Sequence, residues 1–514
     1  MIEARSFWDL AGQRAALTPD ALFAVDEDNR KLSFREYLEA AERCAAGLAE
    51  LGVGAEMPVS WMLPTWLESM ILVGALSRLG AVQNPILPIY RRREVGFITH
   101  QFDANMLIVP GEWRNFDYAQ MAREIAQEQP GLEVLVVDRA LPHADPSTLD
   151  SPPPATSPDD APIRWLFYTS GTTADPKGAL HTDHTLIAFS SGMSDVLALQ
   201  PDDRVAMVFP FTHIGGIGWL CSGLLSGCAQ IAVAQFDPET SVDVLASNGV
   251  TQATAGTAFH QVYLEAQRKS ADPVFRRVRA FPGGGAPKPP QLHHDIKAAF
   301  GGAGIVSGYG LTECPVIAMN SVRDPDDKLA NTEGRPNPPD TKIKIVTLAT
   351  GELAEPGEQG EIRALGRQLC RGYLDASLNS EAFDHDGFFR TGDLGYLDDQ
   401  GFIVITGRLK DVIIRKGENI SAKEVEDLLY EHPKVADVAV IGLPDPDTGE
   451  RCCAVVACRD ASNPLTFDEM TDFLKDRKLM IQKIPEQLET LPEIPRNPPG
   501  KPLKHALRDR YSDE

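Results

Sequence analysis

A loop rich in glycine and hydroxyl groups is the segment of this sequence best suited to holding phosphate. It spans residues 169–178 (TSGTTADPKG) and follows an apolar run at 163–168 that predicts a strand. Backbone amides, short hydroxyls and the single positive charge of Lys177 are the groups that a polyphosphate requires. The loop does not fit the Walker A pattern, because Lys177 is followed by Gly178 and not by Ser or Thr. These features predict a polyphosphate site outside the conventional P-loop NTPases.

Six further motifs follow this loop in chain order. They are PFTH (210–213), GGGAP (283–287), SGYGLTE (307–313), RTGD (390–393), GRLKD (407–411) and PRNPPGK (495–501). Together with the loop they resemble the signature motifs of the adenylate-forming, or AMP-binding, superfamily of acyl-CoA synthetases, luciferases and peptide-synthetase adenylation domains. The resemblance extends over nearly the whole chain.

The resemblance implies a reaction that joins a carboxylate to the α-phosphorus of ATP and expels pyrophosphate. Negative charge must then be gathered and neutralised. The residues implied to contact ATP or AMP are Thr169, Ser170, Gly171, Thr172, Thr173, Lys177, Gly284, Gly285, Ala286, Ser307, Gly308, Tyr309, Gly310, Thr312, Asp393, Arg408 and Lys501. The loop at 169–173 and Lys177 would hold the β- and γ-phosphates.

Individual roles within this set are implied in the same way. Thr312 would bind the α-phosphate, and Glu313 would ligate Mg²⁺, a hard cation suited to a carboxylate. Tyr309 would offer a flat face to adenine. Asp393 and Arg408 would hydrogen-bond the ribose hydroxyls.

Two lysines are implied to divide the catalytic cycle between them. Lys501 would bridge the incoming carboxylate and the α-phosphate, although a lysine in a Pro/Gly-rich loop would by itself predict only a solubilising charge. Lys410 would be the position about which a small C-terminal domain rotates after adenylation. The rotation would bring in a loop formed by Lys416, Gly417 and Glu418, which would shape the tunnel for the thiol of CoA.

His213 is implied to lie beside the acyl carboxylate, as a gate or a neutral hydrogen-bond partner, and to act in catalysis with Thr312 and the two lysines. A lone histidine would otherwise predict a structural role. Gly215 and Gly216 would leave room for the acyl group, and the following Trp219 and Leu220 indicate an apolar pocket. No residue in this stretch provides a countercharge for an ammonium group, which weighs against an amino-acid-adenylating domain.

The chain departs from the family pattern in two places. Arg415-Lys416-Gly417 stands where many relatives have two small residues, which leaves the thiol tunnel uncertain in detail. Pro498-Pro499 stiffens the loop before Lys501. Neither departure removes a chemical group that the reaction needs.

The elements that must position these residues alternate between helices and short strands. A capping box at 33–36 opens a helix that ends at Gly52, and a strand at 59–63 precedes a helix at 65–79. This alternation predicts α/β layers, a large N-terminal domain of layered sheets. Past Thr341, short strands separated by Gly and Asp turns predict a small barrel-like part. The last residues predict a small mobile α+β domain, so we expect domains at 1–409 and 410–514 with the hinge at Lys410.

Composition excludes several other classes of protein. The 49 Lys and Arg against 73 Asp and Glu give a net charge of −24, which argues against nucleic acid or anionic membrane as the main partner. Charges at Glu68 and Arg78 interrupt the most apolar stretch, so no membrane span is predicted. Eight cysteines without a CxxC pair and the absence of a signal-peptide pattern predict free thiols in the cytoplasm.

The sequence thus predicts an ATP- and Mg²⁺-dependent acid–thiol ligase that makes an acyl-CoA, with CoA as co-substrate. An acyl-AMP ligase that loads a separate carrier protein is the main alternative. A luciferase-like oxygenase and a catalytically inactive relative are less favoured, the latter because Lys177, Glu313, Asp393, Arg408 and Lys501 are all present. The C-terminal sequence is similar to that of ligases for medium-chain, alicyclic or steroid-derived acids, and fatty-acid metabolism is the expected setting. Aryl acids and the oligomeric state, including a homodimer, stay open.

Overall fold

A computed structural model describes residues 2–169, 176–285, 288–415, 418–446, 448–496 and 500–512, with only the backbone of residues 418 and 419. Several predicted site residues lie outside the described residues, and nothing structural follows for them. They are Ser170, Gly171, Thr172, Thr173, Ala286, Lys416, Gly417, Pro498, Pro499 and the side chain of Glu418.

A six-stranded sheet forms the centre of the first part of the chain. In spatial order it contains β10 (Lys177–His181), β9 (Trp165–Thr169), β4 (Val82–Pro85), β3 (Pro58–Trp61), β5 (Met106–Val109) and β8 (Glu133–Val136). The strands are parallel except β10, which pairs antiparallel with β9 and lies at the edge. The predicted strand at 163–168 is thus confirmed as β9.

Two four-stranded sheets lie beyond the first. One is ordered β11 (Arg204–Met207), β12 (Ala229–Ala232), β1 (Leu22–Asp26), β2 (Lys31–Ser33). The other is ordered β13 (Phe281–Gly284), β14 (Ile305–Tyr309), β15 (Ala318–Met319), β16 (Arg335–Pro336). Gln252 bridges Val205 of β11 and Ala280 beside β13, so the two sheets are continuous through this residue.

Helices fill the space between the sheets and cover their outer faces. The inner layer shares one apolar core with the three sheets. It contains α1 (Phe7–Leu17), α2 (Phe34–Glu50), α3 (Leu67–Leu79), α6 (Asp183–Val196) and α7 (Ile214–Ser226). The outer layers contain α4 (Arg92–Gln101) and α5 (Tyr118–Glu128) on one side, and α8 (Thr240–Ser247), α9 (Thr257–Lys269) and α10 (Pro290–Ala299) on the other. The predicted layered α/β fold is confirmed.

Antiparallel strands follow this layered part, as the Gly- and Asp-rich turns predicted. The sheet is ordered β17 (Lys342–Val346), β18 (Gly360–Leu365), β19 (Phe389–Leu397), β20 (Ile403–Arg408). Short elements near it and in the layered part are β6 (Glu112–Trp113), β7 (Phe116–Asp117), α11 (Asp326–Asn331) and α12 (Asn379–Ala382).

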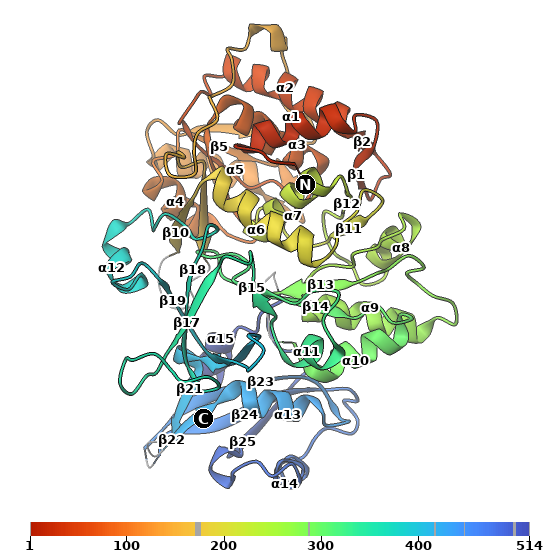
Figure 1. The fold of residues 1–514 in the computed structure, drawn as a ribbon, viewed down its shortest axis with the longest axis vertical. Helices are drawn as coiled ribbons and strands as arrows, with labels where there is room; N and C mark the ends of the chain where they lie inside the picture. Colours follow the sequence, from red (N-terminus) through yellow and green to blue (C-terminus); the bar gives the residue numbers. More distant parts are fainter. Residues whose placement is uncertain are drawn as a thin grey trace.

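The C-terminal residues form a further sheet with its own apolar cores. A short 3₁₀ turn, η3 (Leu409–Asp411), leads into this part. Its elements are β21 (Val412–Arg415), β22 (Glu418–Ser421), α13 (Ala422–Tyr430), β23 (Val435–Asp445), β24 (Gly449–Cys458), α14 (Phe467–Asp476), β25 (Gln487–Leu491) and α15 (Lys504–Tyr511). In Figure 1 this part lies at one end of the molecule, opposite α1 and α2.

Local signals in the sequence are confirmed at several helix ends. Ser33 accepts a hydrogen bond from Glu36 N and its own amide donates to the Glu36 carboxylate, so the predicted capping box opens α2. Thr466 and Glu469 do the same for α14. Gly80 ends α3 with φ of 72°, a left-handed conformation that glycine adopts without strain.

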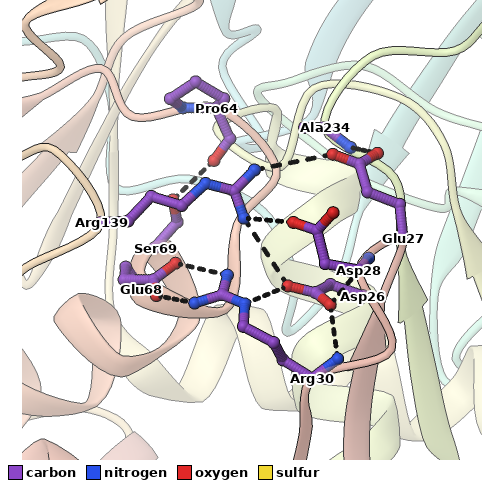
Figure 2. A network of polar contacts seen from close by, with 9 residues as sticks. All are labelled: Asp26, Glu27, Asp28, Arg30, Pro64, Glu68, Ser69, Arg139 and Ala234. Carbon is purple, nitrogen blue, oxygen red and sulfur yellow. Dashed lines mark hydrogen bonds and ion pairs between the residues drawn. The ribbon is translucent and has the colours of Figure 1, made fainter.

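A charged network whose residues belong to none of the predicted motifs joins β1, α3 and the chain after β8. Its charged members are Asp26, Glu27, Asp28, Arg30, Glu68 and Arg139, and Figure 2 shows both guanidinium groups lying between carboxylates. Arg30 contacts Asp26 at 2.7 Å and Glu68 at 2.6 Å. Arg139 contacts Glu27 at 3.6 Å and Asp28 at 3.5 Å. The network fixes the β1–β2 turn to the start of α3.

The prediction of free thiols is confirmed. All eight cysteines are free, and all but Cys458 are buried. Among the described residues, no helix has the length and apolar character needed to cross a membrane.

Candidate active site

The phosphate side of the site begins at the β9–β10 hairpin. Thr169 ends β9 and is the register partner of Lys177, the first residue of β10. Lys177 is exposed, whereas Gly178 beside it is buried. The pairing of β9 with β10 therefore places an exposed lysine at the first position of β10.

The glycines of the predicted adenine region are brought together by two parallel strands. Gly284 of β13 is the register partner of Gly308 of β14. A Cβ atom at Gly284 would lie 2.5 Å from the Gly308 carbonyl oxygen, so the strands tolerate only glycine there. Gly285 follows with φ of 77°. The result is a backbone surface without side chains, against which a flat base can lie closely.

Tyr309, Asp393 and Arg408 form one hydrogen-bonded group. The Tyr309 hydroxyl donates to Asp393 Oδ2 at 2.9 Å, and Arg408 Nε donates to Oδ1 of the same carboxylate. Asp393 and Arg408 are register partners on β19 and β20, which explains their contact. Burial works to lower the pKa of Arg408, but the charge of Asp393, its hydrogen bond and the nearby Tyr309 and Asp411 together raise the pKa. The Asp393 carboxylate, as acceptor, and the Arg408 guanidinium, as donor, are thus held in fixed positions on neighbouring strands of the antiparallel sheet.

Lys501 joins this group from the C-terminal part of the chain. Burial, followed by the positive charge of Arg408, lowers its pKa to about 8. Burial and Arg408 also lower the pKa of Lys410 in η3. The Asp393 and Asp411 charges act on both lysines. Arg408, Lys410 and Lys501, which come before, within and after η3, therefore form a cationic cluster around Asp393.

Thr312 and Glu313 lie next to the phosphate hairpin, where two residues absent from the motif-based expectation hold them. His181 of β10 contacts the Thr312 carbonyl oxygen through Nε2 at 2.9 Å. Burial lowers the pKa of His181 to about 4, so the ring is neutral and Nε2 carries the proton that it donates to this carbonyl. The Tyr373 hydroxyl donates to Glu313 Oε1 at 2.5 Å.

His213 caps the N-terminus of α7 as well as facing a recess. Its Nδ1 accepts from Gly215 N at 3.1 Å, and burial lowers its pKa to about 4. The imidazole is therefore neutral, with its proton on Nε2. A Cβ atom at Gly216 would lie 2.4 Å from the Phe211 carbonyl oxygen, so this glycine is required by the helix start rather than by an acyl group.

The recess beside His213 has a volume of about 300 Å³ including the space open to solvent. The residues that line it are Pro85, Ile86, Leu87, Tyr90, Phe167, Tyr168, Thr212, His213, Ile214 and Thr312. No Asp, Glu, Lys or Arg of the described chain lines it. The Thr65 hydroxyl donates to Phe209 O at 3.0 Å and accepts from Phe211 N at 3.1 Å, which fixes the segment leading to Thr212 and His213.

Only the backbone of Glu418 is described in the predicted thiol-tunnel segment. Glu418 begins β22, whose register partner for this residue is Arg415 of β21. In Figure 1 the β21–β22 hairpin lies at the outer edge of the C-terminal part, away from β13 and β14. The other end of β22 lies beside β20, because the Ser421 hydroxyl donates to the Thr406 carbonyl oxygen.

Profiles of known protein families match the chain in two places. Residues 12–374 match the AMP-binding enzymes, and residues 424–501 match the AMP-binding enzyme C-terminal domain. The chain belongs to the AMP-binding enzyme family. The resemblance seen in the seven motifs is confirmed.

The relatives of this AMP-binding enzyme include, by their names, an acyl-AMP ligase and an acyl-CoA ligase. The salicyl-AMP ligase / salicyl-S-ArCP synthetase of Mycobacterium tuberculosis is 32% identical over 95% of the chain and 88% of the relative. The medium-chain fatty-acid–CoA ligase of Escherichia coli is 28% identical over 98% of the chain and 90% of the relative. O-succinylbenzoate coenzyme A synthetase of Bacillus subtilis, solved with ATP and a magnesium ion, superposes with a TM-score of 0.82 at 27% identity, covering 97% of this chain and 99% of that one.

Sequence reasoning missed His181 and Tyr373. Both lie outside the seven motifs, and each acts on a motif residue through a contact that only the folded chain creates. A histidine in the strand after the phosphate loop and a tyrosine following Gly372 were the available signals. His181 and Thr312 are 131 residues apart in the chain, and Tyr373 and Glu313 are 60 residues apart. The residue types alone do not predict contacts across such separations.

Proposed function

We propose that this enzyme is an ATP-dependent carboxylic acid–CoA ligase that forms an acyl-CoA through an acyl-adenylate. The observation that carries the proposal is the cationic cluster of Arg408, Lys410 and Lys501 beside the glycine-lined ends of β13 and β14. A protein with net charge −24 concentrates desolvated positive charge here, where a polyanion would neutralise it.

The first half-reaction uses this charge. A carboxylate oxygen of the acid attacks the α-phosphorus of ATP, the bond to the β-phosphate oxygen breaks, and pyrophosphate leaves. We assign Lys501 to the charge that develops between carboxylate and α-phosphate, and Lys177 to the departing phosphates. Asp393 and Arg408 would orient the ribose, because their oxygens and N–H groups are already fixed by Tyr309 and by each other.

A divalent cation fits the acidic side of this site. Glu313 provides a buried carboxylate, the hard oxygen ligand that Mg²⁺ prefers, and Tyr373 occupies one of its oxygens. When bound, such a cation would neutralise phosphate oxygens of ATP. The chain's own contribution is to hold Glu313 and Lys177 in fixed positions on either side of the triphosphate.

The second half-reaction needs a different arrangement of the C-terminal part. The thiol sulfur attacks the acyl carbonyl carbon, the bond to the AMP oxygen breaks, and the thiol proton is lost to solvent. The Asp393 charge acts on Lys501 in the present arrangement, whereas the β21–β22 hairpin lies at the outer edge of the C-terminal part. We propose rotation about Lys410 in η3, between domains at 1–409 and 410–514, to exchange Lys501 for the hairpin carrying Lys416, Gly417 and Glu418.

The acyl acceptor distinguishes the two candidate functions. We favour CoA, and the alternative is transfer to the thiol of a separate carrier protein. The printed name of the Mycobacterium tuberculosis relative includes loading of a carrier, whereas that of the Escherichia coli relative specifies CoA. The two activities share the adenylation half-reaction.

The acid itself is proposed to be hydrophobic. The apolar lining of the recess beside His213, without a charged side chain among the described residues, supports a medium-chain, alicyclic, steroid-derived or aryl acid over an amino acid. The two relatives named above act, by their names, on an aryl and on a medium-chain acid.

Carboxylate-dependent exchange of labelled pyrophosphate into ATP, without CoA, tests the proposal. The panel should contain straight-chain acids of increasing length, cyclohexane and aryl acids, and steroid side-chain acids. We expect exchange with one subset, followed by AMP and a thioester when CoA is added. Exchange without thioester formation would favour the carrier-loading alternative, and no exchange with any acid would refute the proposed acyl class.

A further inference from the structure

Tyr373 connects two groups of opposite charge on the phosphate side of the site. Its hydroxyl donates to Glu313 Oε1 at 2.5 Å, and the Lys177 amine lies 5.6 Å from the centre of its ring. A cation at that distance from an aromatic face is attracted by it. One side chain thus contacts both the acid and the base that flank the triphosphate position.

The backbone around Tyr373 is fixed independently of these contacts. Residues 371–374 run beside β10, with Leu180 N donating to Gly372 O at 2.9 Å and Leu374 N donating to Gly178 O at 2.8 Å. The Tyr373 amide donates to Asn379 Oδ1 at 2.9 Å. The segment therefore acts as an added strand that places Tyr373 opposite Ala179, two residues after Lys177 on β10.

The same segment also holds the backbone of Glu313. Cys370 N donates to Glu313 O at 2.8 Å, so both the carbonyl and the carboxylate of Glu313 have partners in residues 370–373. Tyr373 is 5% exposed and Glu313 is 7% exposed. A hydroxyl that occupies one carboxylate oxygen in a buried setting leaves the carboxylate one favoured orientation.

We propose that Tyr373 is a positioning residue for adenylation, which orients the Glu313 carboxylate toward a divalent cation and steadies Lys177 at the phosphates. This inference rests on the proposed function only in taking Glu313 as the cation ligand. Outer-shell partners of metal ligands commonly change metal affinity by about 10–100-fold when they are removed. The proposal predicts that loss of the Tyr373 hydroxyl changes the affinity for the cation by that factor and leaves the affinity for the carboxylic acid unchanged.

Two substitutions separate the hydroxyl from the ring. Tyr373→Phe removes the contact with Glu313 and keeps the aromatic face toward Lys177, whereas Tyr373→Leu removes both. Tyr263→Phe is a matched control, because that buried hydroxyl donates to Thr254 O at 3.3 Å in the core under α9. All three variants should be compared with the unmodified enzyme for unfolding temperature.

The decisive measurement is Mn²⁺ binding by electron paramagnetic resonance, with a non-hydrolysable ATP analogue and no acid. We expect Tyr373→Phe to weaken Mn²⁺ binding about 10–100-fold, with Tyr263→Phe unchanged. In a Glu313→Gln background, Tyr373→Phe should have no further effect. Metal-free binding of the analogue should be weakened by Tyr373→Leu and not by Tyr373→Phe.

Activity provides a second readout. Excess Mg²⁺ should restore pyrophosphate exchange in Tyr373→Phe, with the KM for the acid unchanged. Unaltered Mn²⁺ affinity in Tyr373→Phe, or an equal loss in the Glu313→Gln background, would overturn the proposal. Because binding is measured without an acid, this result stays distinct from a failure of the proposed ligase reaction.

Discussion

Two charged clusters in this enzyme are built on opposite principles. In the network of Figure 2, each guanidinium lies between carboxylates, and hydrogen bonds to Glu68 and Asp26 raise the pKa of Arg30 despite burial. In the Asp393 cluster, cations lie near one another, so burial and Arg408 lower the pKa values of Lys410 and Lys501. In the first cluster four carboxylates surround two cations, whereas the second keeps a positive charge that a polyanion can neutralise. Charge that stabilises a fold and charge that binds substrate can thus be told apart by the sign of their neighbours.

The largest expected effect comes from removing the most strongly desolvated cation of the Asp393 cluster. Lys501→Ala should slow acyl-adenylate formation by roughly 10²–10³-fold, on the order of 3–4 kcal/mol, because the charge acts mainly in the transition state. Pyrophosphate exchange measures this step. Thioester formation from supplied acyl-adenylate should be retained, and equal loss of both steps would refute the assigned role.

Fixing the backbone at the proposed hinge should separate the two half-reactions. Lys410 lies in a 3₁₀ turn, whose φ near −60° proline can adopt, so Lys410→Pro should preserve adenylation. A backbone state that proline cannot adopt costs about 3 kcal/mol, so thioester formation should slow on the order of 10²-fold. Lys410→Ala, which leaves φ unrestricted, is the control. Unchanged overall turnover in the proline variant would contradict the rotation.

The pH dependence of adenylation should report the lowered pKa of Lys501. The amine is protonated below its pKa of about 8 and loses its charge above it. We expect kcat/KM for pyrophosphate exchange to fall about tenfold per pH unit above that value. Lys501→Arg keeps its charge at high pH, so the decline should disappear in this variant even though its rate is lower. A decline that persists in Lys501→Arg would assign the titration to another group.

The smallest functional effect is expected in the charged network of Figure 2. Arg30→Ala leaves the buried carboxylates of Asp26 and Glu68 without their closest partner, which should cost about 1–3 kcal/mol of unfolding free energy. Urea unfolding measures this loss. The kinetics of both half-reactions should be unchanged at a temperature where the variant is folded, because the ion pairs of Arg30 join it to Asp26 and Glu68 and not to the Asp393 cluster. Slower adenylation in folded Arg30→Ala would show that the two clusters are coupled.

The sequence predicted well those features that depend on neighbouring residues. The capping boxes at Ser33 and Thr466, the strand before the phosphate loop and the change to antiparallel strands after Thr341 are all local patterns of hydrogen bonding and apolar periodicity. The seven motifs predicted the family for the same reason, since each is a short segment with a fixed spacing.

The tertiary structure decided which charges meet. The sequence by itself determined that Lys177, Glu313, Asp393, Arg408 and Lys501 are present and what each can donate or accept. Only the fold placed Lys501 beside Arg408, which lowers its pKa, and Tyr373 against Glu313, which orients it. The reason is physical: a side chain's type is fixed by the chain, but its burial and the charges around it depend on residues that are distant in sequence.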